Sequence, residues 1–204
     1  MLASSAFKMA SFYFNISRTR KFSVFSPKTL KEMGLEVLNS SCAYEKTRKT
    51  MDYVNAWQSG SVSSITSEDL ERIPCPKSFA RPIINYVEVD DSVATEDQKR
   101  FKKIMKKFST SIEYTIHGIA NAESYAIDLF WDLIVRFTHY NLPREFYDDM
   151  IYIVNQEAQH FLSWDRRLNE LKCPFGSLPV NVNLWKDAER TAGNPSTRNI
   201  LIVF

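Results

Sequence analysis

Two long amphipathic segments near the middle of the chain carry acidic side chains inside their apolar stripes. In residues 109–137, apolar side chains recur every three or four positions, which is the spacing of a buried helix face, and Glu123 lies within that stripe. In residues 143–171 the same pattern includes Glu157 and His160, which are one helical turn apart. The sequence therefore predicts two long helices whose core faces hold two carboxylates and an imidazole.

The connection between these segments is short, so we expect the two helices to be antiparallel neighbours. Pro143 and Glu145 suit the first turn of the second helix. Glu123 lies about 15 residues before the turn and Glu157 about 14 residues after it, so at about 1.5 Å per residue both lie roughly 20 Å from the turn. The two carboxylates should therefore face each other, with His160 one turn further along.

Two carboxylates at one level of an apolar seam repel each other, and desolvation disfavours both unless they are paired, protonated or bound to a cation. Neither stripe contains a Lys or Arg that would neutralise them. Carboxylate oxygen with imidazole nitrogen suits iron, manganese or zinc, and Glu beside Glu-x-x-His is half of a di-iron carboxylate motif. We therefore predict Glu123, Glu157 and His160 as metal ligands. The alternatives are a Glu157–His160 ion pair or a protonated, hydrogen-bonded Glu.

His117 is a further candidate on the first of these helices. It lies six residues before Glu123, on the flank of the stripe. Three roles are open to it: a metal ligand, a hydrogen-bond partner of a ligand carboxylate, or a core histidine satisfied by a backbone carbonyl. We favour the second and third roles.

Composition favours an ordinary globular chain that is mainly helical. Of 204 residues, 44% are hydrophobic and 25% are charged, and the net charge of +2 indicates no particular partner. No apolar run approaches the length that spans a bilayer, so we expect no membrane partner. Only five Gly and few alternating patterns argue against a β-rich fold. The three Cys are scattered, which fits a reducing compartment and no sulfur-ligated metal.

The N-terminal part of the chain divides into two regions. Residues 1–27 are basic, rich in Ser and Phe and free of acids, which is typical of a mitochondrial transit peptide and also of a disordered N-terminus. We therefore expect an intracellular protein, either mitochondrial or cytoplasmic. Residues 28–98 should contain short helices over 28–39 and 42–57, followed by an extended connector that contains several Pro residues.

The C-terminal part should hold a helical half-bundle over residues 99–192 and a tail over residues 193–204. The half-bundle begins with a basic face over residues 99–107, directly after the acidic residues 90–96. Such a run meets phosphate backbones in some proteins, but we expect a solvated helix face here and no nucleic-acid partner.

The segments around the acidic stripes resemble a ferritin-like family known as domain of unknown function 455. The matching stretches are residues 117–129, 142–149 and 157–161, and the resemblance extends from about residue 27 to residue 198. It implies an all-α fold, a ferritin-like four-helix bundle. It also implies that the three predicted ligands form the first half of a carboxylate-bridged di-iron site, with manganese or zinc as alternatives.

The chain departs from that family's pattern in two ways. Many members carry His where this chain has Asn121 and Asn181, so Asn121 joins His117 as a candidate ligand or hydrogen-bond partner of a ligand. A complete ferritin-like site also takes a second Glu and a second Glu-x-x-His from another helix pair, and the sequence contains no other Glu-x-x-His. Together with the apolar run over residues 200–204, this predicts a shortened form of a longer protein that is missing the second helix pair.

Two classes of function remain open. One is a di-iron carboxylate oxidoreductase or hydroxylase of unknown substrate, in which a homodimer completes a site that is incomplete in one chain. The other is a metal-free helical interaction or structural module, or an inactive truncated isoform. The family's distant similarity to bacterial di-iron hydroxylases of modified tRNA is an analogy of fold and assigns no substrate.

Overall fold

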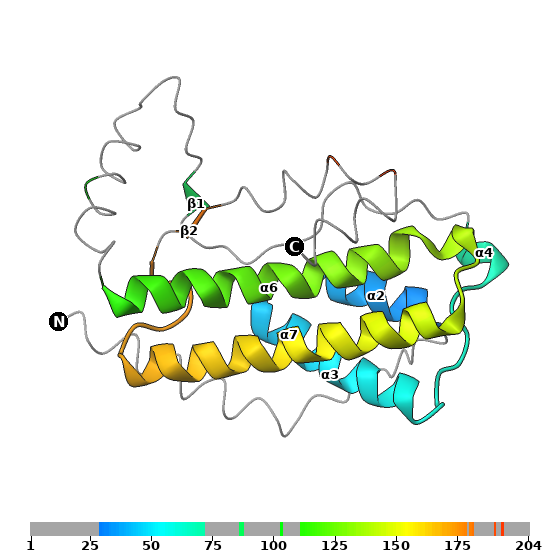
Figure 1. The fold of residues 1–204 in the computed structure, drawn as a ribbon, viewed down its shortest axis with the longest axis horizontal. Helices are drawn as coiled ribbons and strands as arrows, with labels where there is room; N and C mark the ends of the chain where they lie inside the picture. The colour runs from blue at the N-terminus through cyan, green and yellow to red at the C-terminus, as the bar shows by residue number, and fades with distance from the viewer. Residues whose placement is uncertain are drawn as a thin grey trace.

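The long helices of the computed structural model match the two segments predicted from the sequence. The structure describes residues 29–71, 86–87, 103, 111–178, 180–181, 190 and 193, and this part of the chain is mainly α-helical. Helix α6 (Ile112–Arg136) and helix α7 (Arg144–Glu170) lie side by side and run antiparallel (Figure 1). The all-α prediction is confirmed, and both helices begin and end within three residues of their predicted limits.

Local sequence explains where these helices begin and how the chain reverses between them. The Ser111 hydroxyl accepts a hydrogen bond from the Tyr114 N–H at 3.2 Å and caps the start of α6. After α6 comes the short 3-10 helix η2 (Thr138–Tyr140), and Asn141 then adopts a left-handed conformation with φ of 47°. Pro143 is the residue just before α7 rather than part of its first turn, in an extended conformation.

Two N-terminal helices cover one side of this pair. Helix α2 (Leu30–Leu38) packs on α6, and helix α3 (Ala43–Gln58) packs mainly on α7 (Figure 1). Gly34 allows α2 to approach α6 closely, because a Cβ there would lie 3.0 Å from the Trp131 ring and would collide with Val135. The predicted helices over residues 28–39 and 42–57 are therefore present, and they share a core with α6 and α7.

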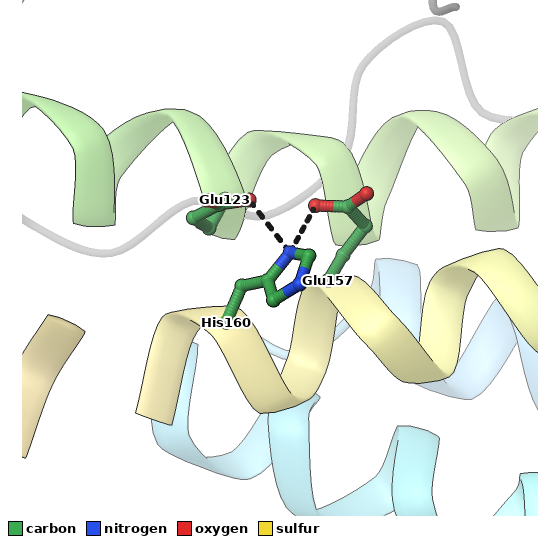
Figure 2. Close-up of side chains that lie close together, drawn as sticks. All are labelled: Glu123, Glu157 and His160. Atoms are coloured by element: carbon green, nitrogen blue, oxygen red, sulfur yellow. Dashed lines mark ion pairs between the residues drawn. The ribbon is translucent and has the colours of Figure 1, made fainter. Parts of the chain in front are cut away.

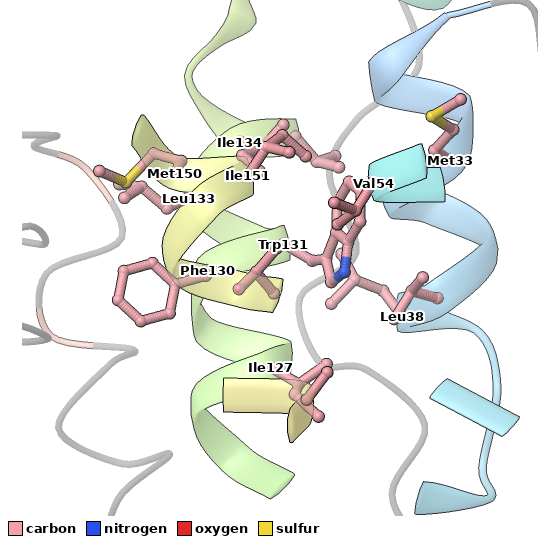
Figure 3. Close-up of a cluster of buried hydrophobic side chains, with 14 of the residues drawn as sticks. Met33, Leu38, Val54, Ile127, Phe130, Trp131, Leu133, Ile134, Met150 and Ile151 are labelled. Atoms are coloured by element: carbon pink, nitrogen blue, oxygen red, sulfur yellow. The ribbon is translucent and has the colours of Figure 1, made fainter. Parts of the chain in front are cut away.

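That shared core is centred on Trp131, whose side chain is fully buried. Figure 3 shows it among apolar side chains that come from α2, α3, α6 and α7. Its indole N–H donates to the Thr50 hydroxyl at 2.9 Å. Nearby, the buried Lys46 ammonium pairs with the buried Asp128 carboxylate. Both helix layers thus contribute polar partners as well as apolar surface.

Only the first part of the predicted extended connector, residues 59–71, lies within the continuous stretch that the structure describes after α3. It includes the four-residue helix α4 (Glu68–Glu71), and its earlier part runs beside the start of α2, where Leu30 N–H donates to the Ser64 carbonyl at 2.9 Å. A short parallel pair of strands, β1 (Tyr86–Val87) and β2 (Val180–Asn181), also went unpredicted. Two-residue strands leave no periodic signal in a sequence.

Several predictions fall outside the described residues. They concern the N-terminal residues 1–27, the apolar run at residues 200–204, and the basic face over residues 99–107 apart from Lys103, which is helical and exposed. Among the helices that the structure describes, none combines the length and apolar character needed to cross a bilayer.

Candidate metal centre

Glu123 of α6 and Glu157 and His160 of α7 converge in the seam between the two long helices. Each offers one ligand atom, and these three atoms all lie within 4.8 Å of one another. Glu123 Oε2 is 3.7 Å and Glu157 Oε2 is 3.6 Å from the same atom, His160 Nδ1 (Figure 2). The structure therefore brings together the two carboxylates that the sequence placed at one level and the imidazole that it placed one turn further along.

The geometry and the donor types of this group fit a transition-metal ion. Two ligands about 2.1 Å from one ion at a tetrahedral angle lie roughly 3.4 Å apart. The observed separations of 3.6 and 3.7 Å would need to shorten by only a few tenths of an ångström. Carboxylate oxygen and imidazole nitrogen together suit iron, manganese and zinc.

The group lies at the edge of the seam rather than in its interior. The side chains of Glu123 and Glu157 are each 18% exposed, whereas that of His160 is 52% exposed. The sequence placed both His160 and Phe161 in the buried stripe, but only Phe161 is buried, and it packs on Tyr44 of α3 with ring centroids 5.7 Å apart. Because neighbouring helix positions point about 100° apart, His160 faces away from α3. An ion held here would keep an open side.

The two carboxylates influence each other strongly. Burial, the hydrogen bond to Glu123 and the charge of Glu123 together raise the pKa of Glu157 to about 8, and burial has the largest effect. Within the described part of the chain, His160 is the only basic residue that forms an ion pair with Glu123 or Glu157. At neutral pH the site therefore favours a bound proton on Glu157, and a bound cation would take the place of that proton.

Trp164 also belongs to the site, although sequence reasoning counted it only as an apolar stripe residue. Its indole N–H donates a hydrogen bond to Glu123 Oε1 at 3.2 Å. The signal in the sequence was its position, four residues after His160 and seven after Glu157, which puts all three on one face of α7. An indole N–H on a face that carries carboxylates needs an acceptor.

His117 lies outside the three-residue group and instead accepts hydrogen bonds from the loop that follows α7. Its ring is fully buried, and Nε2 accepts hydrogen bonds from the backbone N–H groups of Gly176 at 2.9 Å and Leu178 at 3.4 Å. The ring also stacks on Phe175 with a centroid distance of 5.4 Å. Burial lowers the pKa of His117 to about 4, so the ring is neutral with its proton on Nδ1. The described partners of His117 are thus backbone N–H groups and an aromatic ring rather than the backbone carbonyl considered in the sequence analysis.

Asn121 is buried on the same helix as His117, one turn later. It lies two residues before Glu123, so on a helix the two side chains point roughly 160° apart. Among the described residues, its Oδ1 atom and the Nδ1 atom of His117 lack hydrogen-bond partners. Both residues are therefore buried in the core and lie outside the three-residue group of Glu123, Glu157 and His160.

Comparison with known proteins identifies the family. A search of the curated proteins and a search of the solved structures each gave no significant match. A family described as "Protein of unknown function (DUF455)" matches residues 39–203, which include α3, α6 and α7. This match spans most of the chain and contains every residue of the candidate metal centre. The chain therefore belongs to the DUF455 family of proteins of unknown function.

Proposed function

We propose that this protein binds a divalent transition-metal ion through Glu123, Glu157 and His160. The convergence of one oxygen from each carboxylate on His160 Nδ1 is the observation that carries the proposal. Two partly buried carboxylates at this distance are unfavourable as a pair of anions, and a divalent cation would relieve both their repulsion and their desolvation. The open side at His160 would admit water or an exogenous ligand.

The reaction class that fits this site best is oxidation with dioxygen. Glu beside Glu-x-x-His is half of the ligand set of ferritin-like di-iron carboxylate proteins, and bound ferrous ions would supply the electrons that activate dioxygen. The carboxylates would hold and neutralise the metal, and His160 would complete its coordination from the open edge. We therefore propose a ferritin-like oxidoreductase or hydroxylase whose substrate is not specified by these residues.

A second copy of the chain is the proposed source of the missing ligands. His160 is about half exposed, so the open side of the site is accessible to another molecule. A two-fold axis near this edge would bring two copies of the three-residue group together and would supply the four carboxylates and two imidazoles of a complete di-iron site.

The metal content of the purified protein tests this proposal. The protein would be loaded anaerobically with ferrous iron, freed of excess metal and analysed by mass spectrometry alongside Glu123→Ala. Asp149→Ala, which removes an exposed carboxylate from α7, is the matched control. We expect about one iron per chain in the wild type and the control, and none in Glu123→Ala. Sedimentation should show that the iron-loaded wild type is a dimer, which then holds two iron ions. A well-folded wild type without bound metal would refute the proposal.

The second candidate is a metal-free helical interaction or structural module, and the raised pKa of Glu157 favours it. With a pKa of about 8, Glu157 keeps a proton at neutral pH and shares it with Glu123, which neutralises the pair without a cation. In that case the wild type, Glu123→Ala and Asp149→Ala would all contain no bound metal. Glu123→Ala would then be tolerated or stabilising, because it removes a partly buried carboxylate that holds no metal ion.

A further inference from the structure

We propose that Trp164 is a positioning residue of the metal centre, which holds Glu123 so that it presents a single oxygen to the ion. This inference rests on the metal binding proposed above. The two oxygens of Glu123 have different partners: Oε1 accepts the Trp164 indole N–H at 3.2 Å, and Oε2 lies 3.7 Å from His160 Nδ1. Oε2 is therefore the oxygen of Glu123 that faces His160 Nδ1.

The hydrogen bond restricts the rotation of the Glu123 side chain. Trp164 lies on α7 and Glu123 on α6, so the contact bridges the two helices that form the site. A bulky indole with only two side-chain torsions is a stiffer support than a long polar side chain. Because the carboxylate is held before the metal arrives, less rotamer freedom is lost when the metal binds.

The two carboxylates consequently differ in mobility. In the described part of the chain, Glu123 is the hydrogen-bond partner of Glu157, and no indole or amide donor holds Glu157. Glu123 is thus the fixed ligand, with one oxygen committed to Trp164. Glu157 is the adjustable ligand and can approach an ion with one or both oxygens. Loss of the indole N–H would free Glu123 to bind through both oxygens, which would change the coordination of the metal.

The chain offers a matched control for this contact. Trp57 on α3 also donates its indole N–H to a carboxylate of α7, Asp148 Oδ1, at 2.7 Å, and its side chain is buried. Asp148 is not part of the metal-binding group. Trp57→Phe and Trp164→Phe therefore remove the same kind of hydrogen bond and the same part of a ring, but only the second change touches a proposed ligand.

Titration of the full-length protein with Co²⁺ tests the proposal through its visible absorption. We expect Trp164→Phe to weaken Co²⁺ binding roughly 10-fold to 100-fold, the range typical for residues that orient metal ligands. Its Co²⁺ spectrum should also change in shape or intensity. Trp57→Phe should keep the affinity and the spectrum of the wild type, although urea unfolding of the metal-free protein should show that it is destabilised at least as much.

The outcomes separate this inference from the proposed function. A wild type that binds no Co²⁺ would overturn metal binding itself. A wild type that binds, together with a Trp164→Phe variant of unchanged affinity and spectrum, would overturn only the role of Trp164. Equal losses in both Trp variants would also overturn it, because general destabilisation would then explain the effect.

A second measurement uses the wild-type protein and does not depend on either variant being stable. In protein labelled with ¹⁵N, the indole N–H resonances of Trp164 and Trp57 are followed by NMR during titration with diamagnetic Zn²⁺. The Trp164 resonance should shift in proportion to site occupancy, since its acceptor becomes a ligand, while the Trp57 resonance stays in place. Saturation with Zn²⁺ without a shift at Trp164 would overturn the proposal.

Discussion

Glu157→Gln removes the charge of one carboxylate from the candidate metal centre and keeps the shape of the side chain. Burial and the neighbouring Glu123 raise the pKa of Glu157 from 4.5 to about 8 in the folded protein. The folded state therefore holds this proton more tightly than the unfolded chain does. Its contribution to stability is complete below about pH 4.5, and it is lost as the pH rises towards 8.

The size of the effect follows from this shift. Each pKa unit corresponds to about 1.4 kcal/mol, and partial exposure of Glu157 lets water screen some of the interaction, so we expect roughly 2 to 4 kcal/mol. In metal-free buffer at pH 5, the free energies of unfolding of the variant and the wild type should differ by less than about 1 kcal/mol, because Glu157 is neutral in the folded state and its ionisation in the unfolded chain has only begun to cost stability. At pH 9 the variant should be more stable than the wild type by that amount.

Added metal should largely cancel this difference in stability. At a concentration 100-fold above its dissociation constant, a metal that binds only the folded state stabilises it by about 2.7 kcal/mol. We expect this gain in the wild type at pH 9 and little of it in Glu157→Gln, which lacks a ligand oxygen with a charge. Such a result would show that the carboxylates of Glu123 and Glu157, whose proximity is electrostatically unfavourable, bind the metal ion.

Urea unfolding followed by circular dichroism, with EDTA or with Mn²⁺, measures these differences. Asp149→Asn serves as the control because it removes an exposed carboxylate from the same helix. It should follow the wild type at both pH values and in both buffers. A stability difference between Glu157→Gln and the wild type that is the same at pH 5 and pH 9 would refute the electrostatic reasoning.

Two further predictions concern the core that supports the site, and both are checked by urea unfolding at pH 7. Gly34→Ala should destabilise the protein by about 1 to 3 kcal/mol, because the new methyl group would collide with Val135. Gly118→Ala should instead stabilise α6 by about 0.5 to 1 kcal/mol, because Gly118 has open space around it and Ala favours the helix. Lys46→Ala should cost about 3 to 5 kcal/mol, because it takes the ammonium group away from the buried Asp128; a loss below 1 kcal/mol would contradict that reasoning.

The sequence predicted the parts of the site that depend on helix periodicity. The spacing of apolar residues gave α6 and α7 nearly correct limits, and the short turn made them antiparallel. Equal distances from the turn then brought Glu123 level with Glu157. These features follow from local geometry, since each depends on residues close in the sequence or on a single short connection.

The exposure of the site depended on contacts that periodicity does not specify. A stripe of apolar residues leaves the rotation of a helix uncertain by a fraction of a turn, which is enough to move His160 from a buried position to a half-exposed one. Packing of Phe161 against Tyr44 of α3 fixes that rotation. The helices that the sequence analysis treated as separate from the half-bundle therefore decide which way the imidazole faces.

By itself, then, the sequence determined the helical architecture of this DUF455 protein and the meeting of two carboxylates with one imidazole. Only the tertiary structure assigned Trp164 to Glu123, across 41 positions of the sequence, and His117 to the loop at Gly176, across 59 positions. Helix periodicity repeats within a single segment and can be read from its residues alone. A hydrogen bond between distant segments exists only after packing has set their rotation and separation, and at this site that packing decides which oxygen of Glu123 faces His160.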